Sequence, residues 1–150
     1  MTATVKNPYI KIEDDAVYTA SKEELTLMLY DGALKFMNQA IGATENEDMQ
    51  RANSLIIRVE DIIREFQITL DFKYEIANQL NSLYDYMHRR LIEANMKKDA
   101  GIMIEVRDML REFRDMWKEA MSAANSAPNF FALPAPTPVI LFISSIETGY

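Results

Sequence analysis

The sequence predicts an all-α protein, an antiparallel four-helix bundle with an extended N-terminal arm and an irregular Pro-rich C-terminal tail. Helix breakers are scarce before residue 127, with only four Gly and five Pro in 150 residues. Four successive stretches carry apolar residues spaced three and four apart, the period of a helix. A chain that is 49% hydrophobic fits one domain with a sizeable core. We therefore expect an arm at 1–20, a bundle at 21–122 and a tail at 123–150.

The first helix is expected to begin after Ser21. Ser21 and Glu24 have the spacing of a capping box, in which each side chain accepts a hydrogen bond from the other residue's backbone N–H. The helix should run to about Ile41, and its apolar residues cover well over half of its circumference. These are Leu25, Leu27, Met28, Leu29, Tyr30, Ala33, Leu34, Phe36, Met37, Ala40 and Ile41. A helix of this kind is mostly buried.

Three further helices follow, separated by short connections at 42–48, 71–73 and 97–101. Short connections favour antiparallel neighbours. The inward stripe of the second helix is Met49, Ala52, Ile56, Val59, Ile63, Phe66 and Leu70. That of the third is Ile76, Leu80, Leu83, Tyr84, Met87, Leu91 and Ala94. That of the fourth is Ile102, Val106, Met109, Leu110, Phe113, Met116, Trp117 and Ala120.

Composition excludes several classes of protein. A net charge of -7 and a pI near 4.8 make nucleic acid an unfavourable partner. The chain has no Cys, which rules out disulfides, thiolate metal sites and a cysteine nucleophile. The first 15 residues lack the apolar region of a secretory signal, and no run approaches the roughly 20 apolar residues of a membrane span. We expect a cytoplasmic protein with no membrane partner.

Catalytic chemistry has no candidate residues. The only histidine, His88, cannot supply both Glu-x-x-His motifs of a di-iron bundle, and no Gly-rich turn could hold phosphates. Asp85 and His88 share a helix face beside Arg89 and Arg90, which is typical of a solvated surface. The sequence therefore predicts no enzyme activity, no cofactor and no metal site.

Apolar residues outside the predicted seams suggest a binding surface. At 100° per residue, a group of side chains on the last three helices points away from the seams or lies on their flanks. They are Leu55, Ile57, Ile62, Ile68, Tyr86, Ile92 and Ile104. Single exposed apolar residues are ordinary, but a second stripe fits a groove that receives amphipathic helices. Tyr9 and Ile10 of the arm are candidates for a lid over that groove when no partner is bound.

The tail after Ser122 differs from the bundle. Its closely spaced Pro residues forbid a helix, and Glu147 is its only charged side chain. Three interpretations stay open: a disordered extension, a fused or frame-altered end, and a segment that docks on an apolar groove of the bundle.

A set of motifs resembles the FliS family of flagellar export chaperones for flagellin. The motifs, in order, are Asn7-Pro8-Tyr9, Val17, Thr19-Ala20-Ser21, Glu24-Leu25, Leu27 to Ala33, Leu70-Asp71, Leu83 to Met87, Arg90 to Asn95, Arg114-Asp115 and Trp117. One departure from the family is Phe72-Lys73-Tyr74, where relatives commonly have a Gly-rich turn. The tail after Ser122 matches nothing in the family.

The resemblance implies a four-helix bundle whose apolar surface binds the disordered C-terminal segment of flagellin in the cytosol. Flagellin bound in this way would not polymerise early and would stay competent for type III export. Further candidate partners are the flagellar export apparatus, a regulatory protein and a second copy of the chain in a homodimer. The alternative function is a self-associating or regulatory adaptor that binds a regulator of flagellar gene expression.

Overall fold

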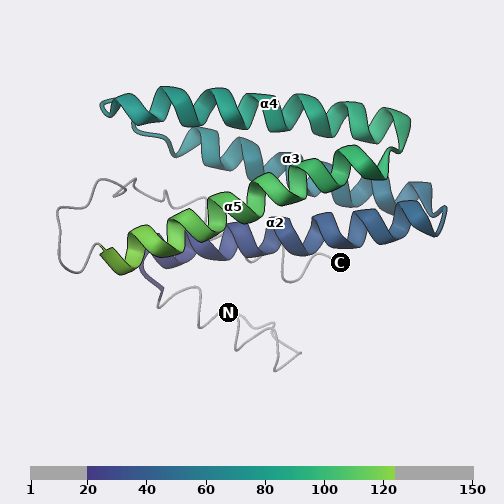
Figure 1. Cartoon of the computed structure of the whole chain (residues 1–150), viewed down its shortest axis with the longest axis horizontal. Coiled ribbons are helices and arrows are strands. Elements are labelled where there is room, and N and C mark those ends of the chain that lie inside the picture. The colour runs from purple at the N-terminus through teal and green to yellow at the C-terminus, as the bar shows by residue number, and fades with distance from the viewer. Residues whose placement is uncertain (1–19, 124–150) are drawn as a thin grey trace, which may run out of the picture.

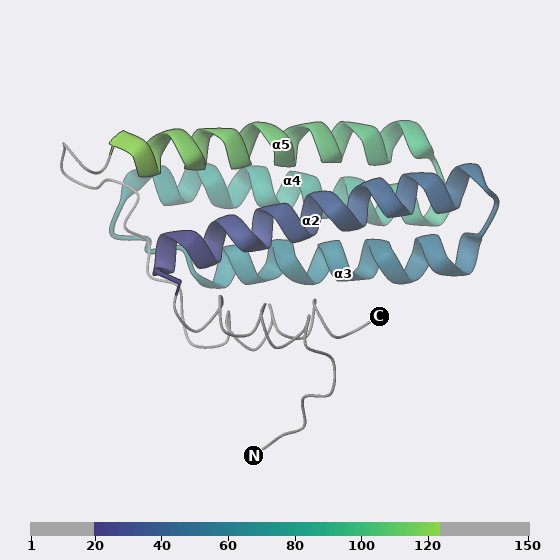
Figure 2. The ribbon, with the colours of Figure 1, turned by 90° about the horizontal axis from the view of Figure 1, so that it is seen from below.

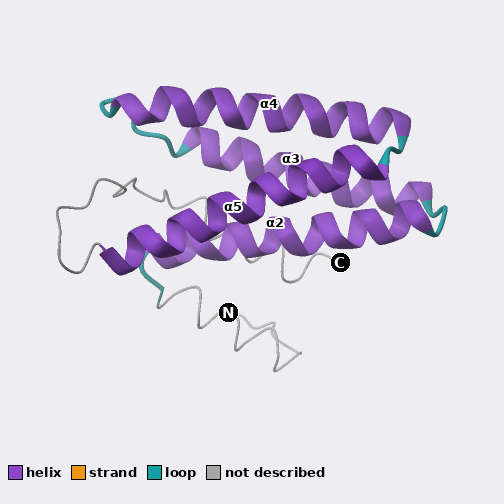
Figure 3. Cartoon of the chain, in the orientation of Figure 1, coloured by secondary structure: helices purple, strands orange, loops and turns teal. Residues whose placement is uncertain are grey.

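The computed structural model describes residues 20–123, and these form four helices joined by short loops (Figures 1 and 3). The helices are α2 (Lys22–Glu45), α3 (Met49–Ile68), α4 (Glu75–Lys97) and α5 (Ala100–Ala123). Tyr9 and Ile10, the predicted lid, and the tail from residue 124 lie outside the described residues. The predicted all-α class and four-helix bundle are confirmed.

The helices run side by side with alternating direction (Figures 1 and 2). Helix α2 packs against α3 and α5, and α4 packs against the same two helices, so the four form a closed square around one core. Each helix therefore faces two neighbours and leaves its remaining face outside. The beginnings of α2 and α4 and the ends of α3 and α5 meet at the same end of the bundle, on the left in Figure 1.

Side-chain caps mark the start of α2, α3 and α5, whereas α4 has no side-chain cap. The capping box at α2 is complete, with Ser21 N–H donating to Glu24 Oε1 (2.9 Å) and Glu24 N–H donating to Ser21 Oγ (3.1 Å). Asp48 Oδ1 accepts from Arg51 N–H at the start of α3. Asp99 Oδ1 accepts from the N–H groups of Gly101 and Ile102 at the start of α5. Each cap pairs backbone donors that a helix start leaves unpaired.

Helix α2 is one turn longer than the sequence indicated. The prediction ended it near Ile41 because residues 42–48 are small and polar, but the helix continues to Glu45. Ala43 and Thr44 are buried in the extra turn, and the Thr44 hydroxyl contacts Met103 Sδ at 3.4 Å. Packing against α5 thus outweighs the weak helix propensity of the segment.

Four residues placed on inward stripes are exposed instead: Met49, Ile76, Leu83 and Met116. Met49 and Ile76 lie in the first turn of their helices, at the ends of the bundle. Leu83 and Met116 lie at the edges of their stripes. Helical spacing gives the direction of a side chain but not whether another element lies opposite it, and this explains the error.

Candidate functional site

An apolar pocket of about 170 Å³ lies at the end of the bundle where α3 and α5 finish. We call it the end pocket. All four helices contribute to its lining, which consists of Thr26, Tyr30, Phe66, Thr69, Leu70, Ile76, Leu80, Tyr84, Phe113, Met116 and Trp117. Ile76 and Met116 are 39% and 54% exposed, so apolar atoms of the lining already face solvent.

One aromatic ring from each helix forms the inner wall of the pocket. Tyr30 of α2 stacks on Phe66 of α3 with centroids 4.4 Å apart, and Phe66 stacks on Tyr84 of α4 at 5.4 Å. Phe113 of α5 meets Tyr84 edge-on at 5.9 Å. These are the separations at which aromatic pairs stabilise one another. The four rings form one packed aromatic cluster.

The polar groups of this wall are paired internally. The hydroxyl oxygens of Tyr30 and Tyr84 are 2.7 Å apart and share a hydrogen bond. Burial raises the pKa of Tyr84 to about 12 and raises that of Tyr30 well above its ordinary value, so both hydroxyls stay neutral. The indole N–H of Trp117 donates to the backbone oxygen of Glu23 at 3.0 Å and ties α5 to the start of α2. The pocket is therefore suited to an apolar group.

Three of the predicted binding residues, Ile57, Ile68 and Ile92, are exposed on α3 and α4. Side-chain hydrogen bonds join Asn53 to Asn95 and Gln67 to Asn81, and these pairs define the antiparallel register of the two helices. Ile57 follows Asn53 by four residues and Ile92 precedes Asn95 by three, so this register places the two isoleucines at about the same height along the bundle. Ile68 follows eleven residues after Ile57, close to three helical turns, and so returns to a similar face.

Two predicted binding residues, Leu55 and Ile62, belong to the core. They are 5% and 0% exposed, and the expectation that they lie outside the packed seam is wrong. The buried arc of α3 is wider than its seam because α2 packs against this helix, and Leu55 lies close to Phe36 of α2. Their part in binding a partner stays a prediction.

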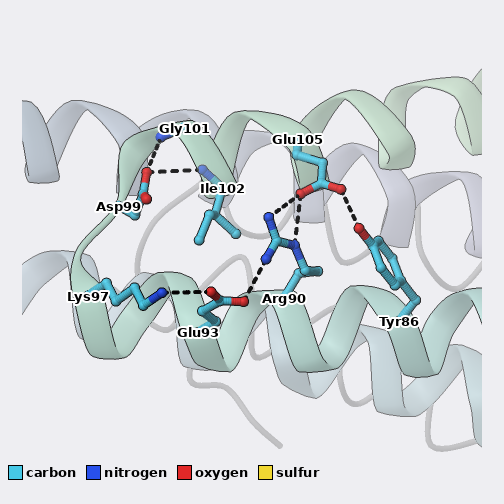
Figure 4. Close-up of polar contacts among 8 residues, drawn as sticks. All are labelled: Tyr86, Arg90, Glu93, Lys97, Asp99, Gly101, Ile102 and Glu105. Carbon is cyan, nitrogen blue, oxygen red and sulfur yellow. Dashed lines mark hydrogen bonds and ion pairs between the residues drawn. The ribbon is translucent and has the colours of Figure 1, made fainter.

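The remaining two, Tyr86 and Ile104, do not join the others. Ile104 is partly buried and packs against the core. Tyr86 belongs to a polar network between α4 and α5, in which its hydroxyl donates to Glu105 Oε2 and Arg90 Nε donates to Glu105 Oε1 at 2.9 Å (Figure 4). Glu93 accepts from Arg90 and from Lys97 and extends the network along α4. The predicted set is thus divided among several faces.

The network gives a testable dependence of stability on pH. Chiefly through the hydrogen bond from Tyr86, and also through Arg90, the pKa of Glu105 lies below its ordinary value of 4.5. The carboxylate therefore stabilises the fold fully above that pH, and the contribution is lost as the pH falls through the lower, folded-state pKa. We expect Glu105→Gln to lower the thermal midpoint at pH 7 and to make little difference in acid.

Glu65 provides the opposite case. It is 7% exposed, burial raises its pKa, and its Oε2 has no hydrogen-bond partner among residues 20–123. Its charge therefore destabilises the fold at neutral pH, and the penalty is relieved as the pH falls through the raised, folded-state pKa. Glu65→Gln should raise the thermal midpoint at pH 7. Thermal melts of both variants between pH 3 and pH 7 check the pair, and shifts of the same sign at pH 7 would contradict it.

His88 has structural neighbours across the α3–α4 contact. Its Nε2 lies 3.2 Å from Arg64 Nη2 and 3.9 Å from Glu60 Oε1. Burial, followed by the Arg64 charge, lowers the pKa of His88. Between residues 20 and 123 no group of three His, Cys, Asp or Glu side chains could hold a metal ion. None of the four described helices is long and apolar enough to cross a membrane.

Sequence reasoning missed the end pocket although it named most of its lining. Phe66, Tyr84, Phe113 and Trp117 were assigned to the core, and so was Met116. The available signal was the position of Phe66 in the last turn of α3, where a bundle opens. The sequence does not give the relative heights at which the helices end, so it cannot show whether such residues close the core or line an open pocket.

Comparison with known proteins gives consistent results. The family model described as "Flagellar protein FliS" matches residues 5–124. The flagellar secretion chaperone FliS of Bacillus subtilis (strain 168) is 44% identical over 119 residues, which cover 79% of this chain and 90% of that protein. The proteins of the same name from Escherichia coli (strain K12) and Salmonella typhimurium are each 33% identical and cover 72% and 83% of this chain, and 82% and 95% of their own lengths. The chain belongs to the FliS family of flagellar secretion chaperones.

Proposed function

We propose that this chaperone binds the disordered C-terminal segment of flagellin in the cytosol, prevents its premature polymerisation and keeps it competent for type III export. Membership of a family of flagellar secretion chaperones supports a flagellar protein as the client. The observation that carries the proposal is the end pocket, an apolar cavity of about 170 Å³ with two exposed apolar side chains at its mouth. Such a surface is typical of a site for an apolar side chain of a partner.

The binding energy would come from covering apolar surface. A disordered segment that folds as an amphipathic helix has an apolar face that needs a partner, and the end pocket offers a rigid site for one anchoring side chain. A few anchors in well-packed pockets usually dominate such interfaces. Because binding by itself covers the apolar surface of the client, the mechanism requires no nucleotide and no metal.

Ile57 and Ile68 extend the proposed site along α3. They are eleven residues apart, which corresponds to about 16 Å along a helix axis. A client helix of similar length lying against α3 and α4 could therefore contact both residues and Ile92. Ile68 is 66% exposed and lies at the end of α3 that forms the pocket, so the two surfaces are near one another.

Size-exclusion chromatography with light scattering, with and without a flagellin C-terminal peptide, tests the proposal. We expect a one-to-one complex. An oligomer whose mass does not change with the peptide would favour the alternative, an adaptor that self-associates or binds a regulator. The roles of Leu55, Ile62, Tyr86 and Ile104 in binding, and of Tyr9 and Ile10 as a lid, stay predictions.

Acidic substitutions on α3 test the second surface. Ile57→Asp and Ile68→Asp should each weaken binding of the peptide about tenfold, since a charge would face the apolar side of the client. Both side chains are exposed, so the free energy of unfolding should change by only about 0.5 kcal/mol. Isothermal titration calorimetry and chemical denaturation measure the two effects.

Asn38→Asp is the matched control. It adds the same single charge on α2, where Asn38 already accepts a hydrogen bond from Arg107. It should leave affinity unchanged. Loss of helicity in Ile57→Asp or Ile68→Asp would show that these side chains are needed for the fold, and full affinity in both would remove this face from the site.

A further inference from the structure

The end pocket lies close to the point where the described chain leaves the bundle. Met116 and Trp117 form part of its wall, and α5 ends at Ala123, only six residues later. Six residues correspond to about 9 Å along the helix axis. The chain then continues for residues 124–150, and the match to the family model stops at residue 124.

The sequence of this extension is largely apolar, as a ligand of the apolar end pocket should be. It contains the apolar segment Phe130-Phe131-Ala132-Leu133, and Glu147 is its only charged side chain. Pro128 disfavours a helix through the residues that precede it, so the sequence favours a change of direction after α5. Seven residues, 124–130, can span up to about 24 Å when extended, which exceeds the roughly 9 Å along α5 from Ala123 back to Trp117.

The size of the pocket suits a phenyl ring. An engineered apolar cavity of about 150 Å³ is large enough to bind benzene, and the end pocket has about 170 Å³. The hydroxyls of Tyr30 and Tyr84 already pair with each other, so an entering group needs no polar partner for them. Phe66, Phe113 and Trp117 all line the pocket, so an entering phenyl ring would have aromatic neighbours to pack against.

We propose that the Phe130-Phe131 segment docks in the end pocket of its own chain and acts as a built-in competitor of the client. A segment tethered this closely has an effective concentration in the millimolar range, so even weak docking would fill the pocket. Occupancy of nine-tenths would weaken client binding about tenfold, because only the open fraction binds. The competitive part of this inference rests on the proposed function, whereas the docking itself does not.

Trp117 is the only Trp in the chain and part of the pocket wall, so its fluorescence reports occupancy without any client. In the full chain, the double variant Phe130→Ser/Phe131→Ser should shift the Trp117 emission to longer wavelength and increase its quenching by acrylamide. A synthetic peptide of residues 124–138 added to this variant should reverse both changes. Phe142→Ser, which removes a phenyl ring elsewhere in the extension, is the matched control and should leave emission unchanged.

Circular dichroism should show equal helicity in all three proteins. Unchanged emission and quenching in the double variant would overturn the docking. If docking occurs, the double variant should also bind the flagellin peptide about tenfold more tightly than the full natural sequence. A shift in emission without a gain in affinity would keep the docking and overturn the competition, and failure of every variant to bind the peptide would instead refute the proposed function.

Discussion

Replacing Phe66 by Ala is expected to lower the free energy of unfolding by about 3 to 5 kcal/mol, the usual cost of truncating a buried Phe. Phe66 is 3% exposed and lies between Tyr30 and Tyr84 in the aromatic wall. The substitution removes both stacking contacts and leaves a void among helices that the remaining core residues hold apart. Urea denaturation followed by circular dichroism measures the change.

Phe72→Ala is the control for this prediction. Phe72 lies six residues later in the α3–α4 connection and is 53% exposed, so its truncation should change stability by about 0.5 kcal/mol or less. Equal effects of the two substitutions would mean that the aromatic wall does not support the core. A loss for Phe66→Ala well below 3 kcal/mol would show that the pocket collapses to fill the space.

Met116→Asp should weaken binding of a flagellin C-terminal peptide about 30-fold, equivalent to about 2 kcal/mol. Met116 faces the end pocket and is 54% exposed, whereas the other two pocket-lining residues of α5, Phe113 and Trp117, are buried. A carboxylate there would have to lose its hydration when an apolar anchor enters the pocket. Because the side chain is already largely in solvent, the fold should tolerate the change.

Met96→Asp separates this effect from a general effect of charge or of losing a methionine. Met96 is 81% exposed near the end of α4, and the end pocket is at the opposite end of that helix. Calorimetry should give an unchanged affinity for Met96→Asp. Similar losses for both variants would indicate nonspecific repulsion of the peptide by an acidic protein, and the pocket would no longer be the anchor site.

The order and type of the helices could be predicted because they depend on local features. The Ser21–Glu24 capping box and the apolar periods of all four segments act within a few residues, and the structure has each helix where those features place it. The boundary near Ile41 was the exception. There, the contact between Thr44 and Met103, residues far apart in the chain, extended the helix.

The candidate site was harder to predict for the same reason. Ile57 and Ile68 were correctly placed outside the core, because both point well away from the seam of α3. Leu55 and Ile62 lie at intermediate angles, where burial depends on how closely α2 packs. A helical wheel contains no information about a neighbouring helix, so residues at its flanks cannot be assigned from it.

The sequence by itself determined that this chain forms four antiparallel helices with an apolar core, since helix caps and hydrophobic periods are encoded over short distances. Only the tertiary structure decided which apolar residues stay uncovered. Ile76 and Met116 have the spacing of core residues, yet they are exposed at the mouth of the end pocket. A side chain is buried only where another surface packs against it, and the heights at which the four helices end determine which surfaces meet.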